Sequence, residues 1–217
     1  SSVQNDVAKL SVQLPIVKDD EDLWDCEIKV NQAILELKRH GGGPVHINLP
    51  TTYSPSYNIK ELPSFRVINR IELNSQFPEL PEGKVAVFVG AHMTMTSKLT
   101  EVIDKFCASR NAVVFCDHTS SYKGQYRLLY SLAVGQKMFD IAANQPDVLI
   151  HIGEVSGDYY STKNIGKKVW RVSEDGEIRD TFKKLRYVFE MPEKNFFEYY
   201  IKEDVDDNNT YLQACKE

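Results

Sequence analysis

Four short runs, mostly of apolar residues, between residues 84 and 172 constrain the fold more than any other feature. The runs are Val85–Val89, Ala112–Cys116, Val148–Ile152 and Lys168–Val172. A continuous apolar run is typical of a strand that is buried on both faces, as in a parallel sheet. Helical patterns separate these runs, and strands that alternate with helices form parallel sheets covered on both faces. We therefore predict a doubly wound α/β domain over residues 84–190.

The helices of this domain are predicted from apolar stripes. One helix is expected to be capped by Ser97, with Leu99, Val102, Ile103 and Phe106 inward. A second is expected over 133–144, and its inward residues would be Met138, Ile141 and Ala142. Near the carboxyl terminus we expect a helix over 195–202 and then a frayed end.

The first fifty residues predict a separate strand–helix–strand unit. A short strand covers 11–15, and a helix with Asp25 as N-cap follows over 25–40. Gly41 suits the left-handed position that ends a helix, and an alternating strand follows over 45–49. The helix stripe consists of Val30, Ala33, Ile34 and Leu37. Because the unit is too small to bury both faces of its strands, we expect it to pack on the α/β domain or on a second copy, or else to be poorly ordered.

The domain boundaries follow from these patterns. Residues 1–52 form the first unit, and 53–83 are rich in proline and read as a linker. Residues 84–190 are the α/β domain, and 191–217 are a helix and tail. Within the linker, Phe65–Ile68 is a possible short strand.

Composition and charge exclude several classes of protein. The net charge of −5 gives no reason to expect a nucleic acid or an anionic membrane as partner. No apolar run approaches the ~20 residues that cross a bilayer. The four cysteines show no zinc or disulfide spacing, which favours a reducing cytoplasm. Cys107 and Cys116 are expected to be core residues.

Gly90 follows the first strand, where a dinucleotide-binding domain would carry G-x-G-x-x-G. The sequence here is Gly-Ala-His-Met-Thr-Met-Thr-Ser, and the second and third glycines are missing. The backbone could therefore not approach a pyrophosphate as that fingerprint requires. A free helix N-terminus can still attract an anion, but we favour a structural role for this loop.

Other polar residues at strand ends give no firm site. Asp117 and His118 are adjacent, a placement that seldom forms a productive acid–base pair. His151 lies inside an apolar run and is expected to be a hydrogen-bonded core residue. The segment 154–158 also lies at a strand end, and Lys163, Lys167 and Lys168 read as a solvated turn. From these motifs we assign no catalytic, cofactor-binding or metal-binding residue.

The segment 42–50, Gly-Gly-Pro-Val-His-Ile-Asn-Leu-Pro, resembles the end of the pyrimidine-binding domain of thiamine-diphosphate-dependent enzymes. The preceding helix, with Asn31–Ile34, and the strand 11–15 are similar to the elements that lead into it. Residues 173–180 resemble the end of the family's central domain, most like the branch that serves menaquinone biosynthesis. The resemblance covers residues 7–190.

This resemblance implies that the chain is the central domain of such an enzyme, with the end of the pyrimidine-binding domain attached. The parent would use thiamine diphosphate and Mg²⁺, decarboxylate a 2-oxo acid and form a homo-oligomer. The family's cofactor-protonating glutamate lies upstream of the matching region, and its Gly-Asp-Gly motif is absent. We therefore expect this chain alone to be inactive. Lys98 is the nearest counterpart of a family lysine that approaches the substrate.

Three alternatives stay open. The parent could resemble acetolactate synthase, although the glycine loop expected of a flavin-binding member is missing. The chain could instead be a free-standing α/β module that binds FAD or ADP at the ends of its strands. It could also be a structural spacer whose role is subunit contact.

Overall fold

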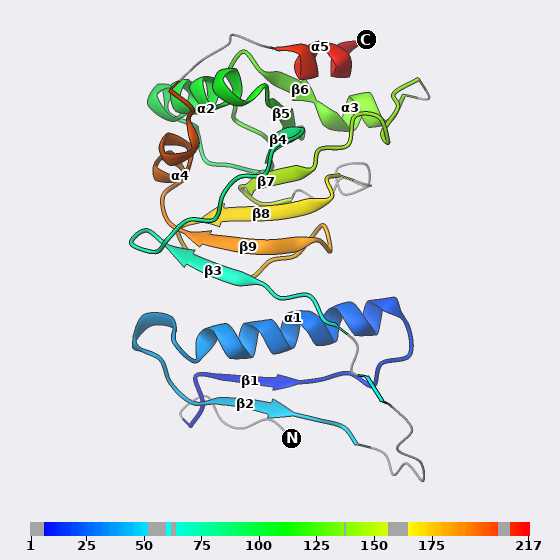
Figure 1. Cartoon of the computed structure of the whole chain (residues 1–217), viewed down its shortest axis with the longest axis vertical. Helices are drawn as coiled ribbons and strands as arrows, with labels where there is room; N and C mark the ends of the chain where they lie inside the picture. The colour runs from blue at the N-terminus through cyan, green and yellow to red at the C-terminus, as the bar shows by residue number, and fades with distance from the viewer. Residues whose placement is uncertain (1–6, 52–59, 62–63, 137, 156–164, 204–208) are drawn as a thin grey trace. The chain divides into compact units, whose positions relative to one another are not determined.

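The computed structural model describes residues 7–51, 60–61, 64–136, 138–155, 165–203 and 209–217 (Figure 1). The chain divides into two compact units, Ser1–Asn69 and Arg70–Glu217. The division falls inside the predicted linker 53–83. Each unit has its own core and is described by itself.

The first unit confirms the predicted strand–helix–strand. Strand β1 (Leu10–Gln13) pairs in parallel with β2 (Val45–Asn48), and helix α1 (Asp20–Glu36) connects them (Figure 1). The predicted N-cap Asp25 is wrong. Asp19 caps the helix by accepting hydrogen bonds from the backbone N–H groups of Glu21 and Asp22. An acidic first turn suits the positive end of the helix dipole, which explains the earlier start.

The end of this helix also differs from the prediction. After Glu36 the chain turns through a 3-10 segment, Arg39–Gly41, so the basic residues there do not form the last α-turn. Gly41 does adopt a left-handed φ of 84°, as expected for the residue that reverses the chain. The neighbouring Gly42 has a φ of 75°, and a Cβ there would lie 2.6 Å from the carbonyl oxygen of Leu37. These glycines therefore permit the sharp exit from α1.

The two faces of the β1–β2 pair have opposite character. One face packs on α1, and its small core consists of Leu10, Val12, Leu14, Cys26, Val30, Ala33, Val45 and Ile47. On the other face the register partners are polar and hydrogen-bonded: Ser11 Oγ lies 3.0 Å from His46 Nδ1, and Asn48 donates to Gln13. Of the predicted helix stripe, Ile34 and Leu37 stay exposed. The unit thus buries one face of its sheet only.

Helix α1 also holds the extended segment 66–68 through side chains one turn apart. Asn31 donates to the Arg66 carbonyl at 3.0 Å and accepts from Ile68 N–H at 2.8 Å. Glu27 accepts from Arg66 N–H at 2.9 Å and pairs with its guanidinium at 3.2 Å. The predicted strand 65–68 is therefore wrong, because side chains of the helix take the place of a neighbouring strand. Strand β3 begins at Asn69 and ends at Glu72.

The second unit is a seven-stranded sheet with the order β3-β9-β8-β7-β4-β5-β6. The strands are β4 (Val85–Val89), β5 (Val113–Cys116), β6 (Arg127–Leu129), β7 (Val148–Ile152), β8 (Lys168–Ser173) and β9 (Leu185–Glu190). Neighbours from β6 to β9 pair in parallel. With flanking helices, this is the predicted doubly wound α/β fold. The order from β6 to β9 is that of a Rossmann sheet that starts at β4.

Helices α2 (Ser97–Arg110) and α4 (Glu193–Tyr200) pack on each other, with the rings of Phe106 and Phe197 5.2 Å apart. Thr96 rather than Ser97 caps α2, because its side chain accepts from Leu99 N–H. Two short helices, α3 (Tyr130–Val134) and α5 (Thr210–Lys216), lie near β6. The frayed end predicted for the tail is therefore wrong for 210–216.

The helix predicted over 133–144 is also wrong. Helix α3 ends at Val134, and turns follow in the described residues up to Asn144. Gly135 is a poor helix residue. Asp140 caps a single turn by accepting from Ala143 N–H at 2.9 Å, and Met138 is 94% exposed. Of the predicted inward residues, Met138 and Ala142 are exposed and Ile141 is half-buried, so they do not form the buried stripe of a helix.

Candidate functional site

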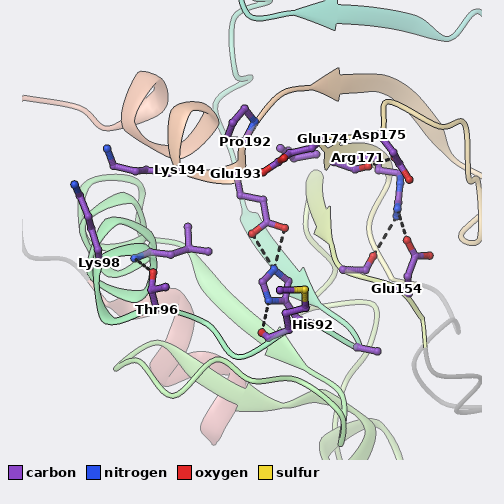
Figure 2. A pocket seen from close by; sticks show the side chains of 16 residues that line it. His92, Thr96, Lys98, Glu154, Arg171, Glu174, Asp175, Pro192, Glu193 and Lys194 are labelled. Carbon is purple, nitrogen blue, oxygen red and sulfur yellow. Dashed lines mark hydrogen bonds and ion pairs between the residues drawn. The ribbon is translucent and has the colours of Figure 1, made fainter.

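A cavity of about 530 Å³ lies in the second unit at the carboxyl ends of β4, β7 and β8 (Figure 2). The first turns of α2 and α4 complete its wall. Ligands of open parallel sheets bind at this edge. The cavity is therefore the candidate site.

His92 and Glu193 face each other in the wall of this cavity (Figure 2). The His92 Nε2 atom lies 3.1 and 3.0 Å from the two carboxylate oxygens of Glu193. The Nδ1 atom lies 2.7 Å from the carbonyl oxygen of Met93. The pair joins the loop after β4 to the first turn of α4.

The environment of His92 favours its charged form. The hydrogen bond to Glu193 raises the pKa of His92, and the negative charge of Glu193 and the Met93 carbonyl act in the same direction. Burial opposes them and only partly offsets the rise in the pKa. His92 therefore keeps its proton to a higher pH than an unperturbed histidine would.

A charge network forms the opposite rim. Arg171 on β8 is 1% exposed and donates to Glu154 at 2.6 Å and to the Gly153 carbonyl at 3.2 Å. Glu154 also accepts from Arg179 at 2.8 Å, and Arg179 pairs with Asp175 at 2.8 Å. One carboxylate shared by two arginines compensates the buried guanidinium, as a buried charge requires.

The crevice between β4 and β7 is closed by backbone contacts. This is the point where the strand order reverses, and where a dinucleotide would bind in a Rossmann domain. Here Ala91 and Glu154 form an isolated bridge, with Glu154 N–H donating to the Ala91 carbonyl at 2.9 Å. A Cβ on Gly90 would lie 2.1 Å from the Glu154 carbonyl oxygen. Gly90 thus permits the close approach of two backbone segments, which agrees with the structural role expected for it.

Two lysines extend from the second positions of α2 and α4. Lys98 and Lys194 line the cavity and point to the same side of it (Figure 2). Lys194 pairs with Glu198 at 3.1 Å. The structure thus places Lys98 in the wall of the candidate site, close to the N-terminal end of a helix, where the dipole already favours anions.

The other polar residues considered in the sequence analysis do not come together in one site. Asp117 is fully buried, and its Oδ1 accepts from Thr119 N–H and Oγ1, both at 2.7 Å, while His118 is exposed. Asp117 therefore shapes its own turn. His151 is a core residue as expected: its Nδ1 lies 3.4 Å from Arg171, and its ring packs on Phe182. Burial, reinforced by Arg171, lowers the pKa of His151 to about 3.

The remaining candidates are Lys167, the two core cysteines and residues outside the described ranges. Lys167 forms an exposed pair with Asp147 at 2.8 Å, and residues 156–158 and Lys163 lie outside the described residues. Cys107 and Cys116 are buried core residues, as predicted, and burial raises the pKa of both thiols. Within the described ranges no three His, Cys, Asp or Glu side chains form a metal site. None of the helices described there is long and apolar enough to span a membrane.

Sequence reasoning missed His92, Glu193 and Arg171. His92 and Glu193 are 101 positions apart, and nothing in the local pattern links them. Arg171 did leave a signal, because it is a charged residue inside an otherwise apolar strand. In the parallel register it lies beside His151, a histidine inside another predicted strand of the same sheet.

The fold and the pocket together define a class of protein. It is a Rossmann-ordered α/β domain with a cavity at the carboxyl ends of its strands. In the sequence a strand–helix–strand unit precedes this domain. This is the arrangement that the resemblance to thiamine-diphosphate-dependent enzymes led us to expect.

Comparison with curated proteins shows which member of this enzyme family the chain is similar to. The chain is 30% identical to 2-succinyl-5-enolpyruvyl-6-hydroxy-3-cyclohexene-1-carboxylate synthase of Phocaeicola vulgatus, over 88% of this chain and 37% of the relative. It is 27% identical to the synthases of Bacteroides thetaiotaomicron and Bacteroides fragilis, again over 88% of this chain. No family model matches. The resemblance to thiamine-diphosphate-dependent enzymes, and to this synthase in particular, is confirmed. The chain spans little more than a third of the length of these relatives.

Proposed function

We propose that this chain is the central domain, with the end of the pyrimidine-binding domain, of a thiamine-diphosphate-dependent synthase of menaquinone biosynthesis. One observation carries the proposal: 88% of the chain aligns with 37% of the synthase from Phocaeicola vulgatus. In this proposal 1–52 end the pyrimidine-binding domain, 53–83 link it to the central domain 84–190, and 191–217 lead onward. The parent is cytoplasmic and forms a homo-oligomer.

Cofactor binding is assigned to the rest of the parent. The sequence holds no Gly-Asp-Gly motif, and the described residues contain no cluster that fits Mg²⁺. In this proposal thiamine diphosphate and Mg²⁺ are bound by other domains of the parent, and we derive no catalytic step from this chain. Its contribution is structural, and the parent would decarboxylate a 2-oxo acid and transfer the product to an acceptor.

Calorimetry tests the central claim. Thiamine diphosphate with Mg²⁺, titrated into the 217-residue chain, is expected to show no micromolar binding and no turnover of a 2-oxo acid. The same titration on a protein that also contains the flanking segments of the gene is expected to show both. Micromolar binding by the chain alone would contradict the proposal.

Lys98 is the one side chain that we propose contacts the substrate of the parent. Its place in the cavity wall supports this role. Lys98→Ala in the longer protein is expected to raise KM for the anionic substrate. Lys105→Ala, on the exposed side of the same helix, is the matched control. Equal kinetics for both variants would remove Lys98 from the site.

The alternative is a module that binds FAD or ADP. The cavity at the strand ends favours it, whereas the bridge between Ala91 and Glu154 closes the usual pyrophosphate position. Thermal unfolding with FAD, ADP and NAD separates the two functions, because a ligand that binds only the native state raises the midpoint. Clear stabilisation by one nucleotide would favour the module.

A further inference from the structure

The contacts of His92 require a proton that a neutral histidine lacks. Both ring nitrogens lie against oxygen atoms: the Met93 carbonyl at 2.7 Å and the Glu193 carboxylate at 3.0 Å. A carbonyl and an ionised carboxylate only accept hydrogen bonds, whereas a neutral imidazole has a single N–H. The observed geometry is satisfied by an imidazolium beside a carboxylate, or by a neutral ring beside a carboxylic acid. Either way, the pair holds one proton more than neutral His92 with ionised Glu193.

The two sides of this contact are held differently. On the α4 side, Phe196, Phe197 and Tyr200 are buried and anchor the helix. On the other side, the loop 91–96 has one buried apolar side chain, Met95, and is otherwise held by polar contacts. These are the Ala91–Glu154 bridge and Ser121, which donates to the Met93 carbonyl at 2.7 Å and accepts from Met95 N–H at 3.2 Å. Met93 itself is 85% exposed. When the contact breaks, the loop rather than the helix is the element that gains freedom.

We propose that His92 and Glu193 form a proton-operated latch that fastens the loop 91–96 onto helix α4 along the wall of the cavity. With the proton bound, both ring nitrogens are satisfied and the loop is fixed. With the proton lost, one ring nitrogen directs a lone pair at an oxygen, and the imidazole leaves one of its two partners. The protonation state of the latch would thus determine whether the loop 91–96, which forms part of the cavity wall, is fixed or mobile. This holds for any ligand of the cavity.

The other charged side chains around the cavity do not replace Glu193 as the partner of His92. Besides Glu193, the charged side chains that line it are Lys98 on α2, Glu154 after β7, Arg171, Glu174 and Asp175 on and after β8, and Lys194 on α4. Arg171 is paired with Glu154, Asp175 with Arg179, and Lys194 with Glu198. Among these charged side chains, Glu193 is the one that hydrogen-bonds to His92, and this bond is the main reason that the pKa of His92 is raised.

Because the pKa of His92 is raised in the folded state, the direction of the pH effect on the latch can be derived. A histidine with a raised pKa in the folded state contributes stability below its unfolded pKa of about 6.5, and this contribution is lost as pH rises through the folded pKa. The latch is therefore closed at mildly acidic pH and opens on the alkaline side of the folded pKa.

Nuclear magnetic resonance on the full 217-residue chain tests the latch. The ring protons of His92, assigned with His92→Gln, are followed as pH is raised in the wild type, in Glu193→Gln and in Glu198→Gln. Glu198 lies on the same helix and pairs with Lys194, so its variant removes one negative charge without touching His92. We expect the midpoint of His92 to fall in Glu193→Gln and to stay close to the wild-type value in Glu198→Gln. An equal fall in both variants, or in neither, would overturn the proposal.

Amide hydrogen exchange provides the second measurement. In the wild type, exchange across 91–96, corrected for intrinsic rates, should accelerate as His92 loses its proton, while α4 stays protected. In Glu193→Gln the loop should exchange fast at every pH. If the wild-type loop shows no change across the titration of His92, the histidine titrates without operating a latch.

Discussion

Both units contain parallel strands connected by helices, but they bury these strands to different extents. In the second unit every residue of β4 and of β7 is buried. In the first unit β2 is only half-buried along its length, and one face of the sheet carries hydrogen-bonded polar pairs. The difference lies in the number of neighbouring strands. β4 has a strand on each side, whereas in the described part of the first unit β1 and β2 pair only with each other. A parallel strand becomes a core element only when both its edges and both its faces are covered.

The two tryptophans allow this comparison to be tested separately in each unit. Trp24 lies on α1 and Trp170 on β8, and the sequence contains no others. Trp24→Phe leaves a reporter for the second unit, and Trp170→Phe leaves one for the first. Each prediction below is measured by urea denaturation followed by the fluorescence of the relevant tryptophan.

The largest effect is expected in the core of the second unit. Phe88 is fully buried, and its ring lies 5.3 Å from that of Phe182. Phe88→Ala should lower the unfolding free energy of this unit by ~3–5 kcal/mol through the cavity that it creates. Val12→Ala in the small core of the first unit should cost ~2 kcal/mol there. Identical shifts for both tryptophans in either variant would show that the units unfold together and would break the comparison.

The next effect concerns the charge network at the cavity rim. Glu154→Gln leaves the guanidinium of Arg171, whose side chain is 2% exposed, without its carboxylate. We expect a loss of about 2–3 kcal/mol, below the usual cost for a buried pair because the Glu154 side chain is 55% exposed. Arg171→Met removes the buried charge itself and leaves a carboxylate that water can solvate. It should therefore destabilise the second unit less, and the reverse order would contradict this account of the rim.

In the first unit, removal of a single side chain should lower the unfolding free energy by almost as much. Asn31→Ala removes the acceptor for Ile68 N–H and the donor to the Arg66 carbonyl. Because Ile68 is 2% exposed, an unpaired N–H there should cost ~1–3 kcal/mol. Ile34→Ala, one turn further along the helix at an exposed position, is the control. Similar losses for both variants would mean that Ile34 packs against something in solution.

The smallest effect is expected at the start of α1. Asp19→Ala removes the side-chain cap that accepts from Glu21 and Asp22 N–H and should cost ~1 kcal/mol in the first unit. Asp20→Ala removes a charge in the first turn but no capping bond, and should cost less. Far-UV circular dichroism should show the loss of helix for Asp19→Ala. If Asp25→Ala proves more costly than Asp19→Ala, the helix begins in solution where the sequence first suggested.

Prediction from sequence was most successful where burial leaves an unbroken apolar run. The strands β4, β5 and β7 were found for this reason. Strand β9, Leu-Arg-Tyr-Val-Phe-Glu, mixes exposed and buried positions and was missed, as was the three-residue β6 at the other side of the sheet. The helix predicted over 133–144 failed because its apolar spacing does not correspond to a buried stripe: Met138 and Ala142 are exposed, and α3 already ends at Val134.

The sequence by itself determined the alternation of strands and helices, the break at Gly41–Gly43 and the resemblance to one enzyme family. These are local properties, set by side-chain size, by hydrophobic period and by the φ angles that glycine permits. Only the tertiary structure decided that Gly90 lets two backbone segments meet, and that His92 faces Glu193 across 101 residues. Such contacts depend on strand order and register, which bring distant residues together, and no local pattern specifies them.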